Sequence, residues 1–157
     1  MTRLAFDPQL KFGQVDISAI RFDPKSRDDI PQILRGLQYI YTQNEIREKI
    51  FQLLEKGILE GKNKKIGRPG MELWKIFVMG ILRVNLNWDY DRLHEQVNNH
   101  NTIRQMLGHS NWEDEQKYHL QTIKDNVQLL TPELLEEINQ VVVEAGHRLL
   151  KKKTWNR

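Results

Sequence analysis

The chain has 157 residues, enough for one domain with a hydrophobic core but too few for two full domains. It contains no cysteine, which excludes disulfides, thiolate zinc sites and cysteine nucleophiles. The net charge of +3 is unevenly distributed: residues 56–69 hold five basic residues and one acid, residues 70–147 hold six basic residues and twelve acids, and residues 148–157 hold five basic residues. This distribution suits contact with a polyanion, although a solvated linker and a frayed basic end explain it equally well.

The N-terminal segment carries charge and proline where a secretory signal would carry an apolar core, so secretion is disfavoured. Residues 1–26 contain two turn-forming Phe-Asp-Pro phrases and no clear period, which predicts an extended arm with at most a short strand. The most apolar stretch, residues 73–86, is interrupted by Lys75 and Arg83 and is shorter than the roughly 20 residues that span a bilayer. We therefore expect a buried helix there and no membrane contact.

Residues 27–57 are predicted to form a pair of helices. The first begins where two acids precede Pro31 in the first turn, and its apolar stripe runs to about Tyr41. The second begins at Thr42, which has capping-box spacing to a glutamate, and Gly57 supplies its stop.

Residues 58–70 combine glycines, a proline and a basic cluster, which predicts a mobile linker between the helix pair and the rest of the chain. The basic side chains are candidate contacts to DNA phosphates: Lys62, Lys64, Lys65 and Arg68. The phrase Gly67-Arg68-Pro69 is shared with AT-hooks of the minor groove, but a proper hook has basic residues on both sides. Because a helix is expected to follow at once, helix initiation is the preferred interpretation of this phrase.

Residues 71–151 are predicted to form the main helical bundle. The segment 71–86 is apolar nearly all round, as expected of a helix that is surrounded by others. Shorter helices are expected over residues 88–97, over residues 102–107, opened by Thr102 and closed by Gly108, and over residues 118–130.

The last predicted helix begins at Thr131-Pro132-Glu133 and continues for about 30 Å to Lys151, followed by a basic tail over residues 152–157. Four cations near this end complement the helix dipole and are further candidate phosphate contacts: Arg148, Lys151, Lys152 and Lys153. The predicted fold class is therefore all-α, a bundle of about six to seven helices with an irregular N-terminal arm and a basic C-terminal tail.

Residues 102–130 have the outline of a helix-turn-helix. The second helix would present side chains that bond base edges or phosphates in the major groove: Lys117, His119, Gln121 and Lys124. The connection between the two helices is longer than the usual three or four residues and carries Glu113-Asp114-Glu115, which would repel phosphate. Ordinary packing within the bundle is therefore the favoured alternative for this helix.

The phrase His94-Glu95-Gln96-Val97-Asn98 approaches the zinc-protease pattern H-E-x-x-H, but Asn98 stands where the second histidine ligand belongs. The other histidines show no shared ligand spacing. We therefore assign no metal site, no cofactor and no catalytic residue, and a small hydrolase that uses His94 and Glu95 is only a third hypothesis.

Several ordered phrases resemble the N-terminal half of bacterial DDE transposases of the ISNCY insertion-sequence group, and the resemblance covers about residues 6–153. The two longest are Gly67–Trp74 and Leu82–His94. Shorter phrases agree in the same order, namely Ser26–Pro31, Arg104–Gly108, Leu120–Asn126 and Val141–His147.

The resemblance implies a non-catalytic DNA-binding and assembly module that engages the terminal repeats of an insertion sequence in DNA transposition. Its implied partners are double-stranded DNA at the element's ends and a second copy or a full-length transposase. Its implied location is the cytoplasm, at the nucleoid.

In such transposases an RNase H-like domain follows this region and holds two divalent metal ions with Asp, Asp and Glu. The sequence stops at Arg157, so we expect no enzymatic activity from it. The rival hypothesis is a structural helical domain, either a dimerisation element or an inert transposase remnant that does not bind DNA.

Overall fold

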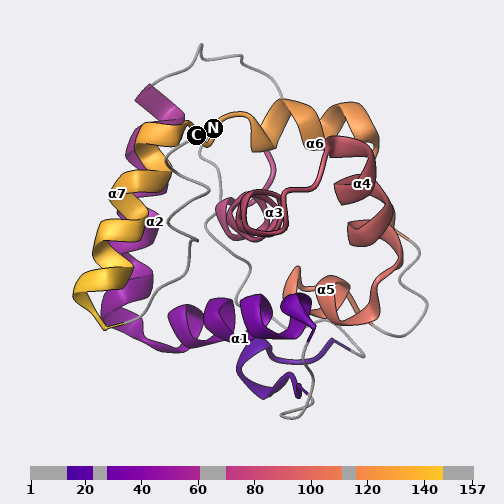
Figure 1. The fold of residues 1–157 in the computed structure, drawn as a ribbon, viewed down its shortest axis with the longest axis horizontal. Helices are drawn as coiled ribbons and strands as arrows, with labels where there is room; N and C mark the ends of the chain where they lie inside the picture. The colour runs from indigo at the N-terminus through magenta and orange to yellow at the C-terminus, as the bar shows by residue number, and fades with distance from the viewer. Residues whose placement is uncertain (1–13, 23–27, 61–69, 111–115, 147–157) are drawn as a thin grey trace.

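The computed structural model describes residues 14–22, 28–60, 70–110 and 116–146 (Figure 1). These residues form seven α-helices and one 3-10 turn without any strand, which confirms the predicted all-α fold. The elements in chain order are η1 (Ile17–Ala19), α1 (Asp29–Thr42), α2 (Asn44–Glu60), α3 (Leu73–Leu86), α4 (Tyr90–Asn99), α5 (Asn101–Met106), α6 (Leu120–Val127) and α7 (Pro132–Glu144). None of these helices is long and apolar enough to cross a membrane.

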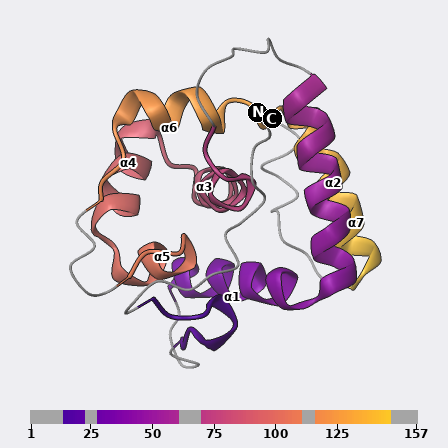
Figure 2. The same cartoon turned by 180° about the vertical axis from the view of Figure 1, so that it is seen from behind.

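α3 is the centre of the molecule. Figures 1 and 2 show it end-on, with the other helices arranged around it as a ring. Ten of its fourteen residues are buried, because its apolar side chains point in every direction and each direction meets a neighbouring helix. The prediction of a surrounded central helix is therefore confirmed.

The aromatic cluster around Trp74 joins α3 to its neighbours. The ring of Trp74 packs edge-on against Tyr41 of α1, with centroids 5.0 Å apart, and against Phe51 of α2, with centroids 6.4 Å apart. The buried indole Nε1 donates a hydrogen bond of 2.8 Å to the carbonyl oxygen of Met106 in α5. One side chain thus packs or bonds to three helices, and the N-terminal helix pair shares its hydrophobic core with the rest of the described chain.

α2 extends beyond the predicted stop at Gly57 and ends at Glu60. Gly57 has a packing role instead: a Cβ added to it would lie 2.8 Å from Cδ2 of Leu134, so the missing side chain leaves a notch for α7. The predicted start at Thr42 is also wrong, because Thr42 is the last residue of α1 and its hydroxyl donates to the carbonyl oxygen of Tyr39. Gln43 alone separates the two helices.

The described part of the N-terminal arm packs on α1 as a capped turn rather than as extended chain or a strand. Asp16 caps η1, since its Oδ1 accepts a hydrogen bond from Ser18 N at 2.9 Å. Ile17 and Ile20 are buried, and their carbonyl oxygens both accept hydrogen bonds from Gln38 Nε2 of α1 at 2.9 Å. Apolar anchors and satisfied carbonyls therefore hold this segment to the bundle.

The starts of the next two helices differ from the prediction. α4 begins at Tyr90 rather than at Trp88, because Asp89 is its N-cap and accepts from Arg92 N at 2.8 Å. α5 is capped by the imidazole of His100 rather than by Thr102. The predicted end at Gly108 agrees with its backbone, which has φ of 95°.

α7 begins as predicted and ends early. Thr131 caps it by accepting from Leu134 N at 3.1 Å, and Pro132 occupies the first turn. The helix ends at Glu144 rather than near Lys151, because Gly146 adopts φ of 93° and leaves the helical path. Its thirteen residues extend about 20 Å, not the expected 30 Å.

Candidate nucleic-acid interface

α6 presents a polar face to solvent, and this is the face that the sequence predicts to meet DNA. His119 at its N-cap and Gln121 in its first turn are exposed, whereas Lys124 is half-buried. Ile123 and Val127 on the opposite face are buried in the core. α6 therefore has a solvent-exposed face, and two of the predicted DNA-contacting side chains, His119 and Gln121, lie on this side of the helix.

Two of the predicted DNA contacts on this segment already have partners within the protein. Gln121 Nε2 donates to Asp125 Oδ1 at 2.9 Å, so a base edge would compete with a carboxylate for this amide. Lys117 Nζ donates to the carbonyl oxygen of Asn98 at 2.6 Å, which holds its charge against α4. Because of these contacts, fewer hydrogen-bond donors on this segment are available to DNA than the sequence predicts.

The segment before α6 is fixed by a buried polar clamp, which comprises Asn98, Arg104, His109 and Tyr118. The side-chain amide of Asn98 forms two hydrogen bonds with the backbone of Tyr118. Tyr118 N donates to Asn98 Oδ1 at 2.7 Å, and Asn98 Nδ2 donates to the carbonyl oxygen of Tyr118 at 3.0 Å. Asn98 is 7% exposed and Tyr118 is 8% exposed, so both hydrogen bonds join buried residues, where a lost bond is costly.

Arg104 and His109 complete the polar clamp from the α5 side. Arg104 is 8% exposed and donates from Nη1 to the carbonyl oxygen of Val97 at 3.3 Å and from Nη2 to that of Gln116 at 2.8 Å. His109 Nε2 and the hydroxyl of Tyr118 share a hydrogen bond of 2.5 Å. The clamp thus connects α4, α5 and the chain that enters α6.

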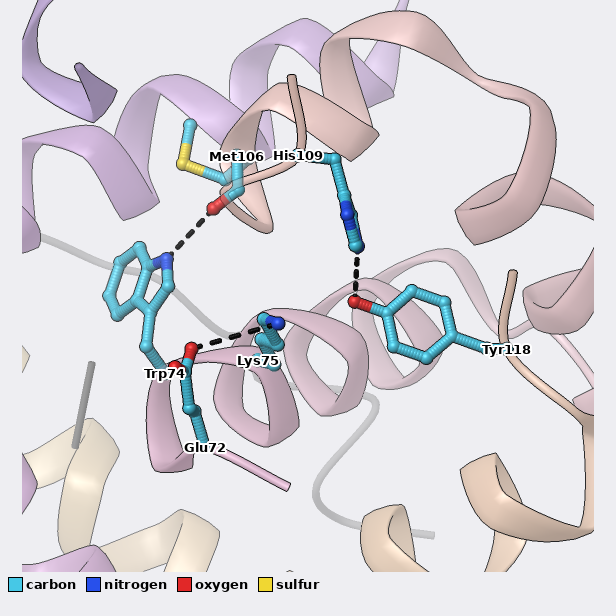
Figure 3. Close-up of polar contacts among 6 residues, drawn as sticks. All are labelled: Glu72, Trp74, Lys75, Met106, His109 and Tyr118. Atoms are coloured by element: carbon cyan, nitrogen blue, oxygen red, sulfur yellow. Dashed lines mark hydrogen bonds and ion pairs between the residues drawn. The ribbon is translucent and has the colours of Figure 1, made fainter. Parts of the chain in front are cut away.

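Figure 3 shows His109 and Tyr118 of the clamp together with residues at the start of α3. His109 and Tyr118 point toward each other, and the indole of Trp74 points toward the carbonyl oxygen of Met106. Glu72, the N-cap of α3, makes no side-chain capping bond and instead forms an ion pair of 3.7 Å with Lys75. These groups are engaged with one another, so we assign them to structure rather than to ligand contact.

The two helices of the predicted helix-turn-helix do not form a close pair. α4 packs against both α5 and α6, and Figures 1 and 2 show α5 and α6 near its opposite ends. In a helix-turn-helix the second helix packs on the first and is held by it in the groove. Here α4, through the polar clamp, holds α6 instead.

The other predicted contacts lie outside the described residues, namely Lys62, Lys64, Lys65, Arg68, Arg148, Lys151, Lys152 and Lys153. The structure does place the points where their segments are attached. α2 and α7 lie side by side and antiparallel, with Gly57 near the end of α2 against Leu134 near the start of α7 (Figure 1). The linker and the tail therefore leave the α2–α7 pair at opposite ends, about 20 Å apart.

The described part of the chain is acidic. It contains 16 of the 21 Asp and Glu residues but only 11 of the 24 Lys and Arg residues. α7 has no Lys or Arg and exposes four glutamates, Glu133, Glu136, Glu137 and Glu144, whereas the neighbouring α2 exposes Glu45, Glu48 and Glu55 together with Lys49 and Lys56. This side of the molecule would repel a phosphate backbone.

The zinc-protease-like phrase on α4 is used for packing. Asn98 belongs to the polar clamp, Val97 is fully buried, and Glu95 forms an ion pair of 3.7 Å with Arg92 on the surface. In the described residues no three His, Asp or Glu side chains come together in a group that could hold a metal ion.

His100 has a structural role that the sequence patterns did not indicate. Its Nδ1 accepts a hydrogen bond of 3.3 Å from Ile103 N and so caps α5. Burial lowers the pKa of His100, because desolvation disfavours the imidazolium form. The neutral ring is also the form that can accept this bond, so the cap and the burial favour the same protonation state.

No family model, curated protein or solved structure matches this chain. The resemblance to ISNCY transposases therefore stays a prediction from sequence.

Proposed function

We propose that this chain is a non-catalytic DNA-binding and assembly module of a transposase-like protein, and that it engages the ends of an insertion sequence. The observation that carries the proposal is the separation of charge. Residues 56–69 and 148–157 hold ten of the 24 basic residues and one of the 21 acids, while residues 70–147 hold six basic residues and twelve acids. Cations near the phosphate backbone are sufficient for affinity, because they release condensed counterions whatever the base sequence.

The geometry supports two separate backbone contacts rather than one continuous basic surface. The linker with Lys62–Arg68 and the tail with Arg148–Lys153 are attached at opposite ends of the α2–α7 pair. The exposed glutamates between these points disfavour a duplex that lies along the solvent face of the pair. The two segments are therefore expected to contact phosphates independently, and their effects on binding should add.

We assign base reading to α6. Gln121 is exposed and its amide has the bidentate pattern that recognises adenine. It must first release Asp125, and this internal competition predicts modest sequence preference. Replacing Gln121 and Lys124 with Ala should reduce the preference for a terminal repeat over random DNA and leave the salt dependence nearly unchanged.

Salt-titrated binding to duplex DNA tests the proposal. Replacing Lys62, Lys64, Lys65 and Arg68 with Ala should lower the slope of log affinity against log salt by up to about 3–4, because each lost phosphate contact contributes about 0.9. The matched control removes four exposed charges from the described surface, namely Arg21, Arg35, Lys49 and Arg92. It should lower the slope by much less.

An equal loss in the control would mean that net charge, rather than the linker, governs binding. If the wild-type chain shows no salt-sensitive binding at low ionic strength, the DNA-binding proposal fails.

A helical dimerisation domain is the alternative, and the acid-rich face of α7 favours protein partners over DNA. Val143, at 41% exposure, is the one exposed large hydrophobic side chain among the described residues. A dimer formed through the described surface would therefore be polar and weak. Size-exclusion chromatography with light scattering, run over a range of protein concentrations, measures the molar mass and decides whether such a dimer forms.

A further inference from the structure

Two arginines in the bundle are stacked on tyrosine rings. Cζ of Arg47 lies 5.3 Å from the ring centroid of Tyr41, and Cζ of Arg83 lies 4.1 Å from that of Tyr90. Both side chains are half-buried, and both have a buried Nε without a hydrogen-bond partner. The two arginines therefore share the same stacking, and they can be compared by the hydrogen bonds of their guanidinium groups.

The outer nitrogens of the two guanidinium groups differ. In Arg47, Nη1 donates to the carbonyl oxygen of Tyr41 and Nη2 donates to Asn44 Oδ1, each at 3.0 Å. Arg83 makes no side-chain hydrogen bond and no ion pair with any described residue. Its Nε is buried, whereas its outer nitrogens, Nη1 and Nη2, are not. The guanidinium of Arg47 is therefore used inside the fold, whereas the outer edge of Arg83 is open.

The turn between α3 and α4 fixes this arrangement. Asn87 adopts φ of 55° and ends α3, and Trp88 N donates to the carbonyl oxygen of Arg83 at 3.1 Å. Asp89 then caps α4 through Arg92 N, so its carboxylate is engaged at the helix end while Tyr90 lies beneath Arg83. A cation in the last turn of α3 also complements the helix dipole, which explains why arginine is tolerated there but not why its donors stay open.

We propose that Arg83, held on the ring of Tyr90, is a preformed oxyanion site whose ligand is a backbone phosphate of DNA. The assignment of the phosphate to DNA rests on the proposed function. A planar guanidinium presents two parallel donors to a phosphate, and stacking on the ring removes most of the rotamer freedom that binding would otherwise cost. Asp89 is the N-cap of α4 and Asp91 lies in its first turn. Because these two carboxylates would repel further phosphates, we expect the site to contact a single phosphate rather than a longer stretch of backbone.

The test uses the full chain and follows the Nε–H resonances of its arginines by nuclear magnetic resonance. Titration with inorganic phosphate, and separately with a short duplex of arbitrary sequence, should shift the resonance of Arg83 and leave that of Arg47 in place. A static Arg83 resonance in both titrations overturns the site. A shift with phosphate in a chain that binds no duplex removes DNA as the ligand and, separately, contradicts the proposed function.

Binding measurements with variants separate charge from geometry. Arg83→Gln should lower the salt slope for duplex binding by about 0.9, as expected for one lost phosphate contact. Arg83→Lys should keep the slope but weaken binding several-fold, because a lysine keeps the charge and loses the stacked fork. Arg92→Gln, which removes an exposed charge from α4, is the matched control and should change neither quantity.

Circular dichroism confirms that each variant is folded before binding is compared. If Arg83→Gln binds duplex with the wild-type slope while the wild-type chain binds normally, Arg83 contacts no phosphate and the inference is wrong, while the proposed function stands. If Arg83→Gln does not fold, Arg83→Lys and the resonance titration decide the question.

Discussion

The helix pairs on the two sides of α3 are held by different chemistry. α2 and α7 meet through apolar contact, with Leu134 seated over the notch at Gly57. On the other side, the chain that enters α6 is held to α4 by the hydrogen bonds of Asn98 to both backbone groups of Tyr118. Apolar packing depends on volume and tolerates small shifts, whereas the clamp depends on particular atoms in particular places. The two sides should therefore respond differently to substitution.

The largest expected effect is on the clamp side. Asn98→Leu keeps the branched shape of the side chain but removes both of its hydrogen bonds to the backbone of buried Tyr118, and it should lower the free energy of unfolding by about 2–4 kcal/mol. The neighbouring Asn99 is exposed and its side chain donates to the carbonyl oxygen of Glu95 in the same helix, so Asn99→Leu should cost less than about 0.5 kcal/mol. Urea unfolding followed by circular dichroism measures both. Similar losses in the two variants would show that the clamp adds nothing specific.

A smaller effect is expected at the α2–α7 contact. In Gly57→Ala the new Cβ would lie 2.8 Å and 2.9 Å from the two terminal methyl groups of Leu134. Overpacking costs about 1–3 kcal/mol, and the better helix propensity of alanine returns up to about 1 kcal/mol. We expect a net loss of about 1 kcal/mol, because Leu134 can rotate to relieve part of the clash.

The same urea unfolding experiment measures the Gly57→Ala variant, with Gln52→Ala on the exposed face of α2 as the control. A Gly57→Ala protein that is more stable than wild type would show that the helices do not need this close approach.

The difference between the two sides also explains how much the sequence could predict. Apolar residues at helical spacing identify α1, α3 and α7, because burial of one face requires that spacing. Thr131 and Pro132 identify the start of α7, since both residue types act locally. The central position of α3 follows from its lack of any polar face.

The missed features depend on contacts between distant segments. Asn98 lies 20 residues from its partner Tyr118, so a pattern read along α4 treats it as one more polar residue. Gly57 resembles a helix stop because only the position of Leu134 shows that the helix continues through it. The apolar stripe that continues to Leu149 predicts a longer α7, whereas the positive φ of Gly146 follows its end at Glu144. For DNA contact, His119 and Gln121 lie on the surface, whereas the internal bonds of Gln121 and Lys117 could not be read from the sequence.

The smallest expected effect concerns α5, which the clamp joins to α6, and it depends on pH. Burial lowers the pKa of His100 below its ordinary value of 6.5, and only the neutral imidazole can accept the capping hydrogen bond from Ile103 N. As the pH falls below 6.5, the unfolded chain takes up a proton at His100 before the folded protein does, so the free energy of unfolding decreases. The contribution is fully present above the unfolded pKa and is lost as the pH falls through the lower, folded pKa.

His100→Asn should remove this pH dependence, because asparagine caps a helix without titrating and keeps the cap at every pH. The control is His119→Asn at the N-cap of α6, where the wild-type side chain makes no capping bond, and it should leave the His100 contribution unchanged. Unfolding free energies measured from above pH 6.5 downward compare the three proteins. If the His100→Asn protein loses stability on acidification as steeply as wild type, the stability of the cap does not depend on the neutral imidazole of His100.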